Sequence, residues 1–180
     1  MPVLVAYASK HGATREIAEH IAQALTAAGQ QAQACPVKSA ENLAGFSAFV
    51  IGSAVYIGHW QKEAVEFVRR NHAVLAGHPV WLFSSGPLGT KPTDAQGRDL
   101  KVTAEPKDIA GFTEAIHPRE HRVFFGVLDP ARLGMSERAL RKLPVGRTLL
   151  PEGDFRDWAE IEDWATAIAR ELTDNQGPPA

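Results

Sequence analysis

The sequence predicts a doubly wound α/β domain, in which helices cover both faces of a parallel sheet. Short runs of consecutive apolar residues alternate along the chain with segments whose apolar residues recur at helical spacing. Most of these runs are continuously apolar rather than alternating, which is typical of strands buried on both faces. Strands that alternate with helices form a parallel sheet through right-handed crossovers. At 180 residues the chain is long enough to bury the core of one such domain.

The predicted elements begin with a strand, a helix and a second strand. The strands are expected at residues 3–8, 31–37, 48–53, 79–85 and 122–128. The helices are expected at residues 14–28, 64–75 and 161–172, the last with Asp154 or Asp157 near its start. Five such strands suit the order 2-1-3-4-5, with residues 128–150 inserted after the fifth strand. We expect one domain over residues 1–173 and a disordered tail over 174–180.

The composition argues against several classes of protein. The net charge is only −2 and both signs are interleaved, so no nucleic-acid surface is expected. No basic leader and no apolar run of about 18 residues is present, which favours the cytoplasm. The single cysteine, Cys35, lacks a partner for a disulfide, and we expect it to fill a small gap on the second strand. His117 and His121 are separated by Pro118, so they do not have helical metal-ligand spacing.

A short loop of small and polar residues, 9–14, connects the first strand to the first helix. Backbone N–H groups and the positive end of the helix dipole converge at such a point, which suits a phosphate. Gly12 permits a sharp turn, and the hydroxyls of Ser9 and Thr14 can donate to phosphate oxygens. The loop matches neither the Gly-Lys-Ser/Thr ending of a nucleoside-triphosphate loop nor the GxGxxG dinucleotide pattern. The alternative is that Ser9 and Thr14 only cap the helix.

Two further loops are expected beside this one, because the strand order reverses between the first and third strands. Residues 54–60 follow the third strand and include Tyr56 and Trp60. Residues 84–91 follow the fourth strand and include Gly86 and Gly89. A flat aromatic ligand could lie between these two loops.

These residues resemble the flavodoxin-like family, in the branch of bacterial menaquinone-dependent protoporphyrinogen IX dehydrogenase. The resemblance is carried by Tyr7-x-Ser9-x-x-Gly12-x-Thr14-Arg15-Glu16-Ile17-Ala18, by Val50-Ile51-Gly52-Ser53 and by Gly58-His59 leading into Glu66-Phe67-Val68. It runs over residues 3–91 and resumes at 122–126 and 157–172. His11 departs from the family pattern, because flavodoxins usually carry a hydroxyl at that position. The implied fold is flavodoxin-like.

The resemblance implies that the protein holds one FMN. Its phosphate would rest on Ser9, Lys10, His11, Gly12, Ala13 and Thr14. Its ring would lie between Ala54, Val55, Tyr56, Ile57, Gly58 and Trp60 on one side and Ser85, Gly86, Pro87, Leu88 and Gly89 on the other. Trp60 or Tyr56 would stack on the ring, although Trp60 could instead pack on the domain. The flavin would perform the chemistry, so no catalytic residue is required, and His59 is a weak candidate for proton transfer or else a capping group.

The resemblance also implies an oxidoreductase of heme biosynthesis, which would pass electrons from protoporphyrinogen IX or a related reduced substrate to menaquinone. One alternative is a flavodoxin-type carrier that shuttles electrons between protein partners. Such carriers are typically strongly acidic, and this chain is not. A second alternative is an interaction domain that keeps the fold without a flavin.

The inserted segment 128–150 is basic and contains several leucines. Such a segment could contact an anionic membrane or cover a quinone-sized ligand, which would place the protein at the inner face of the membrane. The alternative is a short surface helix that packs its leucines on the domain.

Overall fold

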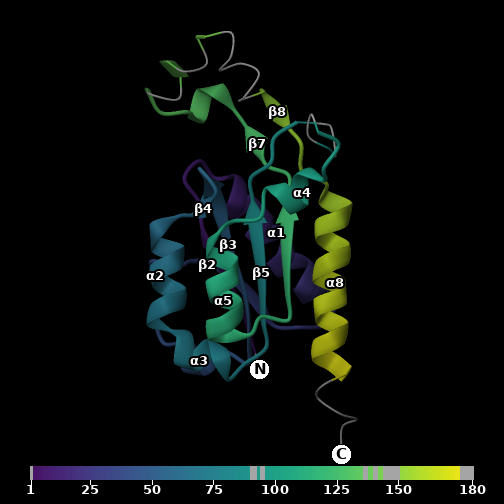
Figure 1. Ribbon diagram of the computed structural model, residues 1–180. Helices are drawn as coiled ribbons and strands as arrows, with labels where there is room; N and C mark the ends of the chain where they lie inside the picture. Colours follow the sequence, from purple (N-terminus) through teal and green to yellow (C-terminus); the bar gives the residue numbers. More distant parts are fainter. Residues whose placement is uncertain are drawn as a thin grey trace, which may run out of the picture.

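The computed structural model has a parallel sheet at its centre with helices on both faces (Figure 1). It describes residues 2–89, 93, 96–135, 138–139, 142–143 and 151–174. The parallel strands are β1 (Val3–Ala8), β2 (Ala32–Pro36), β3 (Ala48–Tyr56), β5 (Val80–Ser85) and β6 (Glu120–Phe124). They pair in the order β2-β1-β3-β5-β6, which confirms the predicted order 2-1-3-4-5.

The helices divide between the two faces of the sheet (Figure 1). One face is covered by α1 (Ala13–Ala27) and α8 (Trp158–Asp174). The other is covered by α2 (Lys62–Arg70), α3 (His72–Ala76) and α5 (Asp108–Ile116). Shorter turns are α4 (Leu100–Thr103) and the 3-10 helices η1 (Leu43–Gly45) and η2 (Pro130–Arg132). The sequence did not predict α5, which supplies the crossover between β5 and β6.

The central strands β1, β3 and β5 are buried on both faces, because successive side chains point to opposite sides of the sheet and helices cover both sides. In β1, Val3 and Val5 pack towards α1 and α8, whereas Leu4 and Ala6 pack towards α2 and α5. Every residue of β1 is buried. This explains why the strands are continuous apolar runs in the sequence.

The third strand ends in a tight hairpin where the sequence predicted a loop. β3 continues to Tyr56 and turns back into β4 (His59–Trp60), with Val55 paired to Trp60. The two turn residues, Ile57 and Gly58, have φ of 51° and 74°. Positive φ at both central residues matches the twist of an antiparallel hairpin. The hairpin therefore extends β3 beyond the carboxyl edge of the sheet.

The predicted fifth strand is wrong in extent, because residues 122–128 form two separate strands. β6 ends at Phe124, where its pairing with β5 ends at Ser85. Gly126 then donates its N–H to the carbonyl of Pro87, which turns the chain away from the sheet. β7 (Val127–Leu128) instead pairs antiparallel with β8 (Gly153–Asp154). This small second sheet closes the base of the inserted segment.

Much of the insertion and the tail lie outside the described residues. These are 136–137, 140–141 and 144–150 of the insertion and 175–180 of the tail; in between, α8 continues to Asp174. Within the described part of the insertion, Leu128 is buried, whereas Met135 and Leu143 are exposed. The described helices include none with both the length and the apolar character of a membrane span.

Cys35 lies on β2, where the sequence placed it. Its side chain is half-buried against the core on the α2 side of the sheet. Burial raises the pKa of its thiol. A raised pKa leaves less of the reactive thiolate, which agrees with a packing role.

Gly52 in β3 offers a test of the packing at the centre of the sheet. A Cβ at this position would lie 2.0–2.4 Å from three atoms of the Phe83 ring. We expect Gly52→Ala to lower the free energy of unfolding by about 3 kcal/mol, measured by urea denaturation. Gly111→Ala in α5 is the matched control, since a Cβ there meets no atom within 4 Å, and it should be neutral or stabilise by up to about 1 kcal/mol. Equal stability of the two variants would contradict the packing described.

Candidate functional site

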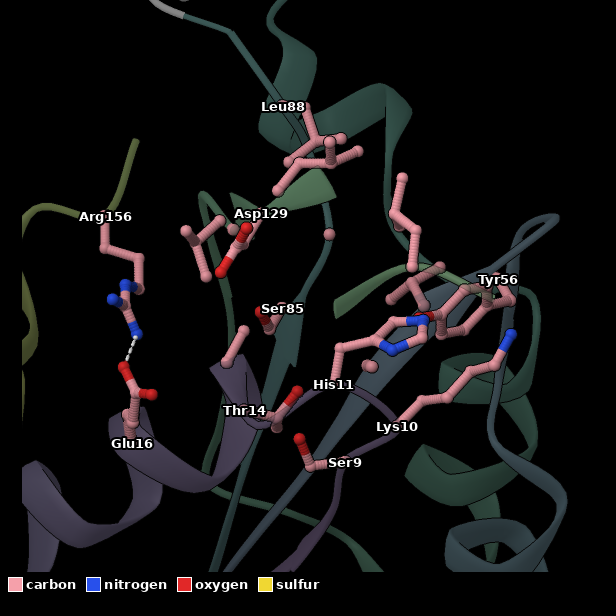
Figure 2. Close-up of a pocket in the computed structure, with 18 of the residues that line it drawn as sticks. Ser9, Lys10, His11, Thr14, Glu16, Tyr56, Ser85, Leu88, Asp129 and Arg156 are labelled. Atoms are coloured by element: carbon pink, nitrogen blue, oxygen red, sulfur yellow. Dashed lines mark hydrogen bonds and ion pairs between the residues drawn. The ribbon is translucent and has the colours of Figure 1, made fainter. Parts of the chain in front are cut away.

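A pocket of about 630 Å³ opens at the carboxyl ends of the strands (Figure 2). Three of its walls are the loops that the sequence predicted to meet there. The residues that these loops contribute are Ser9, Lys10, His11, Ala13, Thr14, Ala54, Val55, Tyr56, Ile57, Ser85, Gly86 and Leu88. The position agrees with the rule that ligands of doubly wound sheets bind where the strand order reverses.

The loop of residues 9–14 connects β1 directly to the first turn of α1. Gly12 has φ of 93°, a left-handed conformation that favours glycine, and it caps the helix N-terminus. The N–H of Gly12 donates to Ser9 Oγ at 3.0 Å. Gly12 itself does not line the pocket, so its part is to shape the turn.

The hydroxyl of Thr14 is a buried polar group at the start of α1. Thr14 is only 1% exposed, and in the part of the chain that the structure describes, its Oγ1 has no hydrogen-bond partner. It lies inside α1 and makes no capping bond, so the capping alternative fails for this hydroxyl. A buried polar atom without a partner is costly unless a ligand satisfies it. Together with the first N–H groups of the helix, Thr14 Oγ1 fits a bound phosphate oxygen.

The hairpin forms the next wall of the pocket. Tyr56 is 38% exposed, and Lys10 Nζ lies 5.1 Å from the centre of its ring. Ile57 at the tip is 98% exposed although it lines the pocket. Gly58 completes the turn without lining the pocket. Tyr56 is therefore the aromatic side chain that this loop presents to a planar ligand.

Trp60 is not brought to the pocket, contrary to expectation. It is 3% exposed and its ring packs 5.1 Å from that of Phe112 in α5. Its Nε1 donates to Ser84 Oγ at 2.7 Å. The side chain points into the core because β4 runs antiparallel to β3, and the packing alternative holds for this residue.

The loop after β5 forms a wall with little side-chain bulk. Gly86 lies close to Val55, since a Cβ at this glycine would come within 3.1 Å of the valine Cβ. Pro87 accepts the N–H of Gly126 and does not line the pocket, and neither does Gly89, which has φ of 113°. Residues 90–92, which include the expected end of this loop, lie outside the described residues.

A fourth wall was missed by the sequence analysis. It consists of Glu16 from α1, Arg156 from the β8–α8 connection, and the residues Gly126, Val127, Leu128, Asp129 and Leu133 at the base of the insertion. Because the predicted fifth strand ends at Phe124, the residues that follow it leave the sheet and line the pocket. Residues 126–128 stood at the end of the predicted fifth strand and Asp129 at the start of the predicted insertion, but no sequence signal linked Arg156 to α1.

His59 lies outside the pocket. Its Nδ1 is 3.3 Å from Asp108 Oδ2, and its side chain is half-exposed. Asp108 also accepts the backbone N–H of Trp60 at 2.8 Å. These contacts join the hairpin to the first turn of α5. His59 pairs with Tyr56 in the hairpin but is not itself among the residues that line the pocket.

A serine, a histidine and a glutamate form a hydrogen-bonded network, in which Ser84 and the His121 ring are buried and Glu105 is half-exposed. Ser84 Oγ lies 2.8 Å from His121 Nε2, and His121 Nδ1 lies 3.3 Å from Glu105 Oε1. Because Ser84 already accepts from Trp60, its hydroxyl donates to Nε2, and His121 carries its proton on Nδ1. Ser84 is completely buried, so no substrate reaches its oxygen. The network therefore holds the hairpin and β6 in place, and it is not a hydrolytic triad.

Comparison with known proteins shows the family to which the chain belongs. A flavodoxin domain matches residues 4–145. The chain belongs to the flavodoxin domain family. It is 26% identical to protoporphyrinogen IX dehydrogenase [quinone] of Escherichia coli K12, over 97% of both chains.

Solved flavodoxin structures share the fold. A single-residue mutant of the flavodoxin from Pseudomonas aeruginosa matches with a TM-score of 0.59 at 18% identity, over 96% of this chain and 99% of that one. The rubredoxin oxygen:oxidoreductase of Desulfovibrio gigas has a TM-score of 0.63 at 11% identity; this chain spans 37% of its length. The protein is an FMN-binding oxidoreductase of the flavodoxin domain family, and the donors around residues 9–14 fit the phosphate of that cofactor.

Thr14 offers a direct test of the phosphate contact. We expect Thr14→Val to weaken FMN binding at least about tenfold, because a hydrogen bond to a charged group is lost. Its free energy of unfolding without FMN should be equal or higher, since a buried hydroxyl without a partner is removed. Fluorescence quenching of FMN measures the affinity. The control is Thr26→Val at the other end of α1, whose hydroxyl bonds to Ala22; equal affinities of the two variants would refute the contact.

The network of Ser84, His121 and Glu105 should make stability depend on pH. Burial lowers the pKa of His121 below its ordinary value of 6.5, although Glu105 opposes the shift. The unfolded chain then binds the His121 proton more readily than the folded chain does. The contribution of neutral His121 to the free energy of unfolding is therefore fully present above pH 6.5 and is lost as the pH falls below it. In urea unfolding, the free energy of unfolding should fall between pH 8 and pH 5, both in the native chain and in the control His72→Gln, which changes an exposed histidine. His121→Gln should flatten this slope, and an unchanged slope would contradict the buried neutral state.

Proposed function

We propose that FMN binds with its phosphate on residues 9–14 and its ring between the β3–β4 hairpin and the loop after β5. The buried hydroxyl of Thr14, which has no partner among the described residues, is the observation that supports this placement. Tyr56 would lie against the ring, and the small residues Ser85 and Gly86 would allow its edge to approach the backbone. The flavin would accept electrons at its own ring, so the role of the protein would be to control which molecules reach the ring and the polarity around it.

We further propose that the electrons come from a small reduced substrate and pass to a quinone. The pocket continues past the three flavin loops to the apolar residues Val127, Leu128 and Leu133, which supply a wall for a second molecule. The relative with a quinone-linked dehydrogenase name aligns along 97% of both chains, the insertion included. Protoporphyrinogen IX is therefore the first substrate to test and menaquinone the first acceptor.

Carrier function is the competing proposal. It is favoured by the similarity to flavodoxins over 99% of their length. It is opposed by the weak net charge of −2, because complementary fields speed the docking of redox proteins. The membrane contact expected from residues 128–150 stays a prediction, since much of that segment lies outside the described residues.

The test is turnover by the purified protein loaded with FMN. We expect oxidation of protoporphyrinogen IX, followed by porphyrin fluorescence, to require a menaquinone analogue. Leu133→Asp should lower turnover at least about tenfold while FMN stays bound, because a charge replaces part of the apolar wall. Val74→Asp, on exposed α3 at the opposite end of the sheet, is the control and should leave turnover unchanged. If the native protein loaded with FMN reduces no quinone, the proposal of a quinone-linked enzyme is refuted and the carrier proposal remains.

A further inference from the structure

A buried guanidinium forms part of the pocket wall, and the proposed function does not use it. Arg156 follows β8, and its side chain is 6% exposed. It lies outside the segment that matches the flavodoxin domain, which ends at residue 145. Figure 2 shows its side chain directed at Glu16, on the first turn of α1. The chain that follows the insertion therefore contacts the helix into which the phosphate loop leads.

Glu16 creates an electrostatic conflict at this helix N-terminus. An acidic side chain in the first turn is favourable in the free protein, because it faces the positive end of the helix dipole. The same helix end is where the proposed function places a phosphate. Glu16 lines the pocket together with Thr14, two residues earlier. Two anions in one partly buried pocket repel each other strongly unless a cation lies between or beside them.

Arg156 supplies that cation. Its Nη1 donates to Glu16 Oε2 at 2.7 Å. Asp154 holds the guanidinium in position through two bonds, from Nε at 2.8 Å and from Nη2 at 2.6 Å. The Trp158 ring lies 4.4 Å from the guanidinium carbon, which limits its movement further. These bonds lower the pKa of Asp154 and keep that carboxylate ionised.

We infer that Arg156 is a positioning residue of the cofactor site, which neutralises Glu16 so that α1 can accept the FMN phosphate. The inference rests on the phosphate placement proposed above. Arg156 need not touch the phosphate, because three of the five N–H groups of its guanidinium already face the two carboxylates. The pairing of β7 with β8 brings Arg156 to α1, so the closed base of the insertion becomes part of the cofactor site.

A double-mutant cycle with two ligands tests this role. Dissociation constants are measured for FMN and for riboflavin, which lacks the phosphate, in the native chain, Arg156→Met, Glu16→Gln and the double variant. We expect Arg156→Met to weaken FMN about ten- to a hundredfold and riboflavin less than about twofold, because only FMN meets the exposed charge of Glu16. Adding Glu16→Gln should restore FMN affinity to within about threefold of the native value. Arg156→Lys, which keeps the charge, should lose less affinity than Arg156→Met.

Other outcomes would overturn the inference. Equal losses for FMN and riboflavin would show that Arg156 only maintains the fold, and a loss that Glu16→Gln does not restore would show a direct phosphate contact. If Arg156→Met does not fold, Glu16→Gln alone still tests the inference. This variant removes the negative charge of Glu16 and leaves the charge of Arg156 in place, so FMN should bind more tightly. Unchanged or weaker FMN binding would contradict the inference. Equal affinity of the native chain for FMN and riboflavin would instead refute the phosphate placement itself. None of these measurements depends on the electron acceptor.

Discussion

The structure depends on one connection, the sharp turn that carries the chain from β1 into α1. Gly12 adopts a left-handed conformation there, and the helix starts at the next residue. The first N–H groups of α1 and the hydroxyl of Thr14 consequently meet at the carboxyl end of the central strands. Helix N-termini attract anions because their N–H groups lack helical partners. A phosphate at this point would give a partner to the Thr14 hydroxyl, which is buried without one among the described residues.

The rest of the pocket follows from where the neighbouring strands end. β3 continues past the sheet edge as a hairpin and presents Tyr56, while β5 ends in a loop of small residues. The network of Ser84, His121 and Glu105 joins the hairpin to β6 from behind. The pairing of β7 with β8 then brings the apolar residues Val127 and Leu128 into the pocket wall. An FMN site with such a wall suits the transfer of electrons between FMN and a second small molecule.

Much of the fold could be predicted because burial on both faces leaves a clear pattern of apolar runs. The strand order and the three loops around residues 9–14, 54–60 and 84–91 followed from that pattern. The direction of Trp60 could not be predicted, because it depends on the antiparallel pairing of β3 and β4. The break after Phe124 was missed because the apolar run continues through Val127 and Leu128 although the pairing with β5 ends. Arg156 was missed because its contact with Glu16 spans 140 positions of sequence.

The central claim is that the start of α1 holds the phosphate of FMN. A crystal structure of the protein grown with FMN tests it most directly. The account predicts phosphate oxygens within about 2.7–3.2 Å of backbone nitrogens in residues 10–14 and of Thr14 Oγ1. A phosphate bound elsewhere, or a flavin ring seated away from the hairpin and the loop after β5, would contradict it.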